Sequence, residues 1–315
     1  MKTISIVAPA YNEAANLPAL AEAVGALLEK KLLPMGYAGR LLIVNDGSSD
    51  DTAQILQQLH SRYPFLDYIN LSRNFGKENA LLAGIDHADG DAVVIIDSDL
   101  QHPLDVIPDM IKCWEDGYDD VYGERLDRGK ESWMRRKLSL SYYNLLQRST
   151  PMEILPNVGD FRLLDRRCIR ILRELRETQR YNKGLFAWIG FKKKGVPYQT
   201  ADRTAGKSSF NLRRLIRLSI EGISSTTTAP LRFATWLGII VSFIAFCYLL
   251  IVLCKTIIWG EPVRGYPTIL CVILFLGGCQ LLALGIIGEY IARIFSESKH
   301  RPPYIARDIV KHPSP

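Results

Sequence analysis

The chain has 315 residues, 48% of them apolar, and a formal net charge of +6 at pH 7. This length allows one fair-sized globular domain with additional elements. The basic residues gather at 135–137, 213–217 and 299–311, beside amphipathic or apolar stretches. Basic charge in such places favours an anionic lipid surface and argues against nucleic acid as a partner.

Short apolar runs alternate with helical stretches through the first hundred residues. The sequence predicts strands at 4–8, 41–44, 68–71 and 92–96, and helices at 16–31, 50–61 and 77–87. This alternation is typical of an α/β protein with a mostly parallel, Rossmann-like sheet covered by helices on both faces. Ligands bind at the carboxyl ends of such strands. Asp46 follows the second predicted strand, and Asp97 and Asp99 follow the fourth.

Two long apolar stretches, 236–258 and 267–292, follow this part of the chain. Each is long enough to cross a bilayer of about 30 Å, and two buried helices of a soluble protein are the alternative. Basic residues precede the first stretch and follow the second, which places both ends in the cytoplasm. The N-terminus shows no signal-peptide pattern, so we expect a multi-pass membrane protein with its globular part in the cytoplasm.

These boundaries predict four regions. They are a globular domain at 1–210, an amphipathic interfacial segment at 211–232, a two-helix membrane anchor at 233–292 and a basic tail at 293–315. A further interfacial helix is expected at 131–148. Packing against the globular core is the alternative for both amphipathic segments.

Asp97-Ser98-Asp99 forms an Asp-x-Asp motif directly after a predicted buried strand. Two carboxylates in such a turn can converge on a hard divalent cation, Mg²⁺ or Mn²⁺, together with phosphate oxygens of a substrate. Gln101 offers a neutral oxygen nearby, and the sequence therefore predicts a metal site at Asp97, Asp99 and Gln101. Solvated loop acids are the alternative, and loop polarity accounts for the neighbouring His102.

Four segments carry a resemblance to a known family. They are Pro9-Ala10-Tyr11-Asn12-Glu13, Asn45-Asp46-Gly47-Ser48-Ser49-Asp50, Arg73-Asn74-Phe75-Gly76-Lys77 and Asp97-Ser98-Asp99-Leu100-Gln101. In number and order they resemble the nucleotide-binding core of glycosyltransferase family 2, in its polyprenyl-phosphate branch. Gly159-Asp160-Phe161-Arg162, the two apolar stretches and Gly288-Glu289-Tyr290 are similar to bacterial and prophage bactoprenol glucosyltransferases of O-antigen modification. The resemblance covers nearly the whole chain and implies a GT-A fold.

The resemblance also implies roles on the donor side. Asp97, Asp99 and Gln101 would hold the metal and the diphosphate. Asp46 would accept a hydrogen bond from uracil, or else only tighten its own turn. Lys77 would offset phosphate charge, and a solvated lysine in the first turn of a helix is the alternative. The residues implied in nucleotide-sugar binding are Pro9, Tyr11, Glu13, Asp46, Lys77 and Asp97.

On the acceptor side, the resemblance implies that Arg125 and the pair Arg135 and Ser139, one helical turn apart, bind the lipid phosphate. A guanidinium fork suits that group, and a basic helix face on lipid headgroups is the alternative for the pair. The acceptor loop of the family often reads Arg-x-x-Gly-x-Ser-Lys-Tyr. Here it runs from Arg203 to Phe210 with Lys207 before the serine. Arg203 and Lys207 are expected to bind the lipid phosphate, and which cation closes over the substrates is left open.

Asp160, Asp99 and Arg125 are the catalytic residues that the resemblance implies. Asp160 would orient or deprotonate the acceptor. A phosphate monoester is largely dianionic at neutral pH, with a second pKa of about 6, so positioning is expected to matter more than base strength. Attack opposite the leaving diphosphate would invert the anomeric carbon without a protein nucleophile.

The sequence thus predicts a metal-dependent enzyme that transfers glucose from UDP-glucose to undecaprenyl phosphate. Other donors remain open, namely UDP-N-acetylglucosamine, GDP-mannose and UDP-4-formamido-arabinose. A processive polysaccharide synthase and a non-catalytic membrane scaffold with a nucleotide-binding fold are the more distant alternatives. The resemblance also implies a homo-oligomer, a tetramer, in the bacterial inner membrane.

Overall fold

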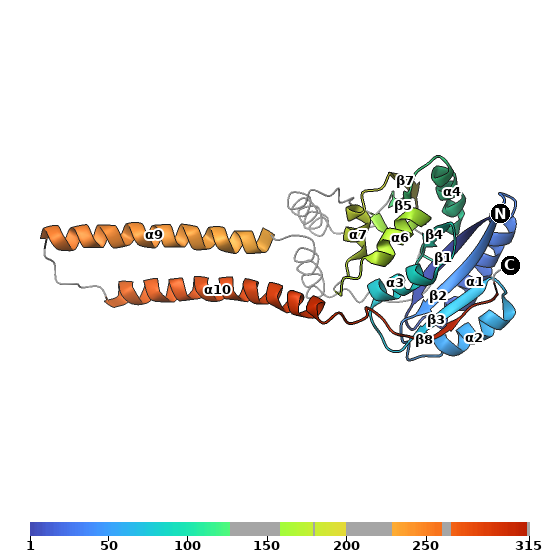
Figure 1. Cartoon of the computed structure of the whole chain (residues 1–315), viewed down its shortest axis with the longest axis horizontal. Helices are drawn as coiled ribbons and strands as arrows, with labels where there is room; N and C mark the ends of the chain where they lie inside the picture. The colour runs from blue at the N-terminus through green and yellow to red at the C-terminus, as the bar shows by residue number, and fades with distance from the viewer. Residues whose placement is uncertain (127–157, 179, 200–228, 260–265, 314–315) are drawn as a thin grey trace. The chain divides into compact units, whose positions relative to one another are not determined.

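The computed structural model describes residues 1–126, 158–178, 180–199, 229–259 and 266–313 (Figure 1). The chain forms two compact units. The larger one contains Met1–Asn211 together with Arg301–Pro315, and the smaller one contains Leu212–His300.

The larger unit is built on an eight-stranded sheet with the strand order β7-β5-β6-β4-β1-β2-β3-β8. Neighbouring strands β3, β2, β1 and β4 run parallel, as do β5 and β7. In contrast, β6 is antiparallel to β4 and β5, and β8 is antiparallel to β3. The predicted α/β class is confirmed, as a mixed sheet whose central strands are parallel. The strands are β1 (Lys2–Ala10), β2 (Tyr37–Asn45), β3 (Leu66–Leu71), β4 (Ala92–Ile95), β5 (Asp120–Arg125), β6 (Val158–Asp165), β7 (Lys193–Tyr198) and β8 (Ala306–Val310).

Helices cover both faces of this sheet (Figure 1). Successive side chains of β1 point to opposite faces, so Ile4 and Ile6 enter one core cluster while Val7 enters the other. This double burial explains why the central strands read as continuous apolar runs. The first cluster includes α1 (Leu17–Leu27, continued by a π-helical turn at Leu28–Leu32), α2 (Thr52–Arg62) and α4 (Ile107–Glu115, after a 3-10 turn at Leu104–Val106). The second includes α3 (Lys77–His87), α6 (Arg166–Glu174) and α7 (Asn182–Trp188).

The strand register brings several loops to one edge of the sheet. Parallel pairing aligns Ala10 with Asn45, so β1 and β2 end side by side. Ile95 of β4 lies opposite Arg162 of the antiparallel β6, so β6 begins at the edge where β4 ends. The loops that follow β1 to β4 therefore share this edge with the first residues of β6.

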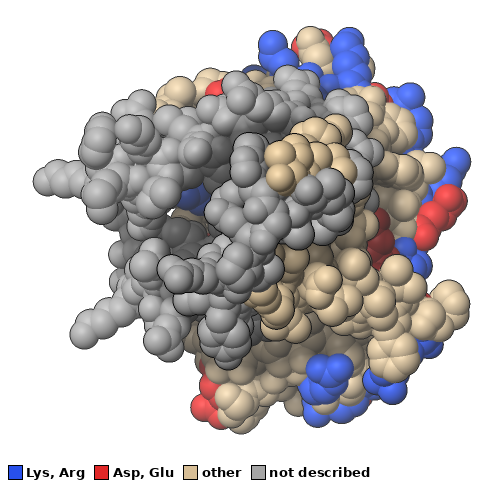
Figure 2. Space-filling view, turned by 90° about the vertical axis from the view of Figure 1, so that its left-hand side faces the viewer, with Lys and Arg blue, Asp and Glu red and all other residues tan. Residues whose placement is uncertain are grey.

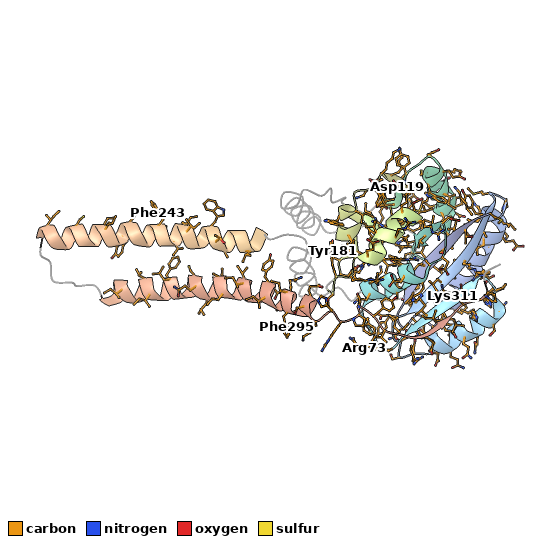
Figure 3. The ribbon with its side chains drawn as sticks, in the orientation of Figure 1. Arg73, Asp119, Tyr181, Phe243, Phe295 and Lys311 are labelled. Atoms are coloured by element: carbon orange, nitrogen blue, oxygen red, sulfur yellow. The ribbon has the colours of Figure 1, made fainter. Side chains whose placement is uncertain are left out.

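The smaller unit contains two long helices, α9 (Ala229–Trp259) and α10 (Tyr266–Ser298), which lie side by side (Figure 1). Apolar side chains project from both, among them Phe243, 67% exposed, and Phe295, 60% exposed (Figure 3). Within the described residues, one stretch, Phe275–Ser298, has the length and apolar composition of a membrane span. The second predicted span therefore stays a prediction. The interfacial segments predicted at 131–148 and 211–232 lie outside the described residues, except for 229–232, which begin α9.

The C-terminal segment returns to the larger unit and supplies an edge strand. We expected a basic tail there, and the structure adds β8, which pairs with β3. Lys311, labelled in Figure 3, donates hydrogen bonds to the carbonyl oxygen of His87 and to Asp89 Oδ2, each at 2.6 Å. The ring of His312 stacks on His60 with 3.8 Å between centroids. These contacts fasten the tail along the outer edge of the sheet.

Candidate active site

The loops after β1 and β2 are joined by hydrogen bonds. Asn12 N donates to Ser48 Oγ at 2.9 Å, and Asn12 Oδ1 accepts from Ser49 N at 2.9 Å. Asn12 adopts a left-handed φ of 56°, which asparagine tolerates better than most residues. The joined loops hold Tyr11, whose surface is 48% exposed, beside the edge of the sheet. Pro9 is buried within β1, and Glu13 is half-buried just beyond Asn12.

Asp46 binds the loop that leads into α3. Its buried carboxylate accepts from Phe75 N at 2.7 Å through Oδ1 and from Gly76 N at 2.9 Å through Oδ2. Burial raises the pKa of Asp46, while the two backbone N–H groups and the charge of Arg73 oppose that rise. The carboxylate thus reaches a neighbouring loop instead of tightening its own turn. A carboxylate has about four acceptor sites, so Asp46 retains capacity for a ligand.

Gly47 explains how these two loops approach so closely. Its φ is +63°, and a Cβ there would lie 2.3 Å from the carbonyl carbon of Arg73. Any larger residue would force the loops apart. Arg73 in turn stacks on Phe75, with 4.0 Å from the guanidinium carbon to the ring centroid. The Asp-Gly pair therefore fixes the start of α3.

Lys77, the first residue of α3, bridges two carboxylates, one on the turn after β4 and one on β6. Its Nζ lies 2.6 Å from Asp97 Oδ1 and 2.8 Å from Asp160 Oδ2. Burial would lower the pKa of Lys77, but the charges of Asp160 and Asp97 and the hydrogen bonds to them raise it above its ordinary value. Lys77 is therefore a cation at neutral pH, and it joins two residues that the sequence assigned to different tasks.

Asp160 stands at the start of β6 with its side chain 12% exposed. Within the described residues, its Oδ1 is buried and has no hydrogen-bond partner. Burial raises the pKa of this carboxyl, but Lys77, Lys183 and Arg162 together hold it below its ordinary range. Asp160 is thus an ionised carboxylate with one oxygen free to accept a hydrogen bond or a proton.

Asp97, Asp99 and Gln101 lie on the turn after β4. Asp99 Oδ1 accepts from Gln101 N at 3.1 Å, and Leu100 between them has a φ of 59°, a strained conformation for leucine. The described residues contain no cluster of three or more His, Cys, Asp or Glu that could enclose a metal ion. Asp97 and Asp99 nevertheless fit Mg²⁺ or Mn²⁺, because Mg²⁺ commonly takes one or two carboxylates and completes its sphere with substrate phosphates.

His102 contacts this turn through a hydrogen bond to Asp97 N, a role that the sequence analysis missed. It is buried, and its Nδ1 accepts from Asp97 N at 3.1 Å, so the proton of the neutral ring lies on Nε2. Burial lowers the pKa of His102. The ring stacks on Phe161 with 4.7 Å between centroids and meets Tyr198 edge-on at 6.2 Å. We call His102, Phe161 and Tyr198 the aromatic cluster.

The aromatic cluster also reaches Arg125 at the end of β5. Arg125 Nε donates to Tyr198 Oη at 3.0 Å. Phe161 and Tyr198 pack against Gly123, where a Cβ would lie 2.7 Å from the ring of Phe161. The turn that carries Asp97, the arginine Arg125 and Phe161 next to Asp160 therefore form one packed unit.

Two further groups make contacts that the motifs did not indicate. Glu78 Oε2 accepts from Asn182 N at 2.8 Å, and burial, helped by the charge of Asp160, raises the pKa of Glu78 to about 7. Arg162 forms a buried ion pair with Asp120, at 3.0 Å from Nη1 to Oδ2. Arg162 stands in a segment that carries the resemblance, but its ion pair with Asp120 and the burial of Glu78 follow only from the folded chain.

Among the residues predicted on the acceptor side, the structure describes Arg125 and Asp160. Arg135, Ser139, Arg203 and Lys207 lie outside the described residues.

The fold and this site define a GT-A-like α/β protein, with acidic loops at the carboxyl edge of parallel strands. Two family profiles match the chain: glycosyl transferase family 2 over residues 5–172 and the GtrB C-terminal hairpin over residues 229–294. The chain therefore belongs to glycosyltransferase family 2, and the resemblance stated from the sequence is confirmed.

The chain is similar over nearly its whole length to several relatives. It is 43% identical over 305 residues to the bactoprenol glucosyl transferase of Shigella phage SfV, covering 97% of this chain and 98% of the relative. It is 41% identical over 308 residues to the prophage bactoprenol glucosyl transferase homolog of Escherichia coli K12, covering 98% and 99%. Among solved structures, mannosyl-3-phosphoglycerate synthase from Rubrobacter xylanophilus shares the fold, with a TM-score of 0.50, 17% identity, and coverage of 70% of this chain and 71% of that one.

Proposed function

We propose that the protein transfers glucose from UDP-glucose to undecaprenyl phosphate, a polyprenyl phosphate, in a metal-dependent and inverting reaction. The relatives named as bactoprenol glucosyl transferases match nearly the full chain, which supports the donor sugar and the acceptor. The observation that carries the proposal is the meeting of Asp97 with Asp160 on the Lys77 ammonium. A single side chain, that of Lys77, thus contacts both the turn assigned to the donor and Asp160, which is assigned to the acceptor.

The donor side is assigned to the loops after β1, β2 and β4. Tyr11, Glu13 and Asp46 flank the nucleoside, while Asp97 and Asp99, with Gln101, hold the diphosphate through Mg²⁺ or Mn²⁺. The bound cation offsets the charge that develops on the leaving diphosphate. The hydrogen bond from Asp97 N to His102 fixes the turn before substrate arrives, which lowers the cost of ordering it.

The acceptor side is assigned to Asp160 and Arg125. A lipid phosphate oxygen attacks the anomeric carbon, the bond from that carbon to the diphosphate oxygen breaks, and UDP departs with the electron pair. The dianionic phosphate needs no base, and Asp160 Oδ1 can take the proton of a monoprotonated phosphate. Arg125 offers a guanidinium to the lipid phosphate.

The placement at a membrane belongs to the same proposal. The apolar side chains of α9 and α10 are exposed over much of their length, which supports a two-helix anchor and the domain boundaries predicted above. Arg135, Ser139, Arg203 and Lys207 remain assigned to the lipid phosphate, and a homotetramer at the cytoplasmic face of a bacterial inner membrane remains the proposed state. On the face shown in Figure 2, the basic side chains of the described residues form separate groups around the margin, with acidic side chains among them.

The test is transfer of radiolabelled sugar to undecaprenyl phosphate by the purified full chain in detergent. UDP-glucose, UDP-N-acetylglucosamine, GDP-mannose and UDP-4-formamido-arabinose are compared, with Mn²⁺ and with EDTA. We expect lipid-linked label from UDP-glucose alone, lost with EDTA and in Asp99→Asn. Label from a different donor would correct the sugar. Absence of lipid product from every donor would favour a non-catalytic scaffold.

A further inference from the structure

Three carboxylates lie at the active-site edge, two of them on the turn at residues 97–101, which we call the metal turn. Asp97 and Asp99 lie on the turn after β4, and Asp160 lies at the start of β6. Lys77 is the cation that contacts this group directly among the described residues, at 2.6 Å from Asp97 and 2.8 Å from Asp160. It therefore stands between a carboxylate assigned to the metal and a carboxylate assigned to the acceptor.

The backbone of Lys77 is held from behind, while its side chain remains accessible. Both oxygens of Asp46 bind the N–H groups of Phe75 and Gly76, the two residues that precede Lys77. The side chain of Lys77 is nevertheless 46% exposed. A lysine head group on a flexible stem can therefore change partners without any movement of α3.

A divalent cation on Asp97 and the ammonium of Lys77 cannot share that carboxylate without cost. Like charges a few Å apart repel strongly where the surroundings are partly buried. Asp160 would remain a partner of Lys77, and the diphosphate of the donor would offer its oxygens in place of Asp97. The nucleotide thus supplies the partner that the metal takes away.

We propose that Lys77 is a built-in counterion of the metal turn. The metal displaces the Lys77 ammonium from Asp97, and the diphosphate of the donor then binds this ammonium. The inference rests on the proposed metal-dependent function and adds an order of events to it. Metal alone binds weakly, because it must displace the ammonium without offering another partner. Metal and nucleotide bind with positive coupling, and the coupling is reciprocal.

Removing the charge of Lys77 should raise the affinity for Mn²⁺ alone and lower the coupling between Mn²⁺ and UDP. In Lys77→Gln, free Mn²⁺ should bind roughly tenfold more tightly than in the unmodified protein, because one repelling charge is gone. UDP should increase the Mn²⁺ affinity of this variant several-fold less than it does in the unmodified protein. Lys77→Arg keeps the charge and should keep the weak binding of free Mn²⁺.

The experiment is a Mn²⁺ titration of the full chain in detergent, followed by the electron paramagnetic resonance signal of free Mn²⁺, with and without UDP. Lys183→Gln is the matched control, because Lys183 also lowers the pKa of Asp160 but has no ion pair with Asp97. It should raise the affinity for free Mn²⁺ far less than Lys77→Gln does. A thermal melt of each variant checks that it is folded.

Two results would overturn the inference. The first is that Lys77→Gln binds Mn²⁺ without UDP no more tightly than the unmodified protein does. The second is that Lys183→Gln increases the affinity for Mn²⁺ as much as Lys77→Gln does. If the unmodified protein binds no Mn²⁺ even with UDP, the metal-dependent function fails as well. That outcome differs from Mn²⁺ binding with UDP that is indifferent to Lys77, which would refute the counterion alone.

Discussion

Two acidic regions at the same edge of the sheet are held in different ways. Asp46 is buried, and each of its carboxylate oxygens accepts a hydrogen bond from a backbone N–H group. Asp97 and Asp160 instead share the side-chain ammonium of Lys77, and Asp160 Oδ1 has no partner within the described residues. The backbone partners of Asp46 are fixed by the fold, whereas the ammonium can exchange for a ligand.

This difference separates the scaffold from the chemistry. Asp46 positions the loop before α3. The group around Lys77 is the one that we propose to bind a cation, a diphosphate and a phosphate acceptor. Changes at the first region should therefore appear as lost stability together with weaker nucleotide binding, and changes at the second as lost transfer. The predictions below test that division, starting with the largest expected effect.

Asp97→Asn should lower the transfer rate by at least on the order of a hundredfold, because a metal ligand contributes several kcal/mol of charge stabilisation. Its melting temperature should change little, since Lys77 keeps Asp160 as a partner. The measurement is kcat at saturating UDP-glucose and Mn²⁺. Asp105→Asn serves as the control, because that exposed carboxylate only pairs with Lys31 on the surface. A rate within threefold of the control would contradict the assignment of Asp97.

Asp46→Ala should destabilise the larger unit by about 1–3 kcal/mol, because it leaves the N–H group of Phe75 without its acceptor and the N–H group of Gly76 with Asn74 Oδ1 alone. Asp46→Asn keeps one acceptor oxygen and should lose less. Thermal unfolding of both variants in the same detergent gives the comparison. If Asp46→Ala has the same melting temperature as the unmodified protein, Asp46 does not stabilise the loop before α3.

His102→Phe should weaken binding of UDP with Mn²⁺ roughly tenfold, because the turn loses the hydrogen bond that orders it before substrate arrives, and such a bond contributes about 1 kcal/mol. Phenylalanine keeps the stacking on Phe161 but removes the acceptor for Asp97 N. His102→Asn makes the opposite exchange, because its amide oxygen can take the place of Nδ1. Calorimetric titration with UDP in the presence of Mn²⁺ should therefore give a higher affinity for His102→Asn than for His102→Phe. The reverse order would assign His102 to packing alone.

Glu78→Gln should stabilise the protein by about 1 kcal/mol at pH 8 and hardly at all at pH 5. Burial and the charge of Asp160 raise the pKa of Glu78 to about 7. The folded state therefore loses stability relative to the unfolded state as the pH rises from the ordinary glutamate value of 4.5 to about 7, and the loss is complete above that pH. Glutamine keeps an oxygen for Asn182 N and removes that loss. The check is the difference in melting temperature at the two pH values, and an equal difference at both would contradict the prediction.

The parallel half of the fold could be predicted from local sequence. Strands buried on both faces read as short apolar runs, and Asp46, Asp97 and Asp99 stand directly after such runs. Because parallel strands end at a common edge, the chain order alone brought these loops together. The antiparallel strands β6 and β8 do not follow from alternation, and no local pattern showed that the basic tail joins β3.

The contacts that organise the site depend on pairs far apart in the chain. Lys77 and Asp160 were both singled out, but their ion pair required the register of β6 against β4. His102 was interpreted as a loop residue because only the folded chain places Phe161 under its ring. Glu78 carried no signal, since its burial depends on α7.

The most direct test of the account is the structure of the product lipid. The full chain is incubated with UDP-glucose, in which the sugar is α-linked, undecaprenyl phosphate and Mn²⁺, and the anomeric configuration of the lipid-linked sugar is determined by NMR. The account predicts β-linked glucose, because the lipid phosphate attacks opposite the diphosphate with Asp160 beside it. An α-linked product, or UDP released without any glucose on the lipid, would contradict it.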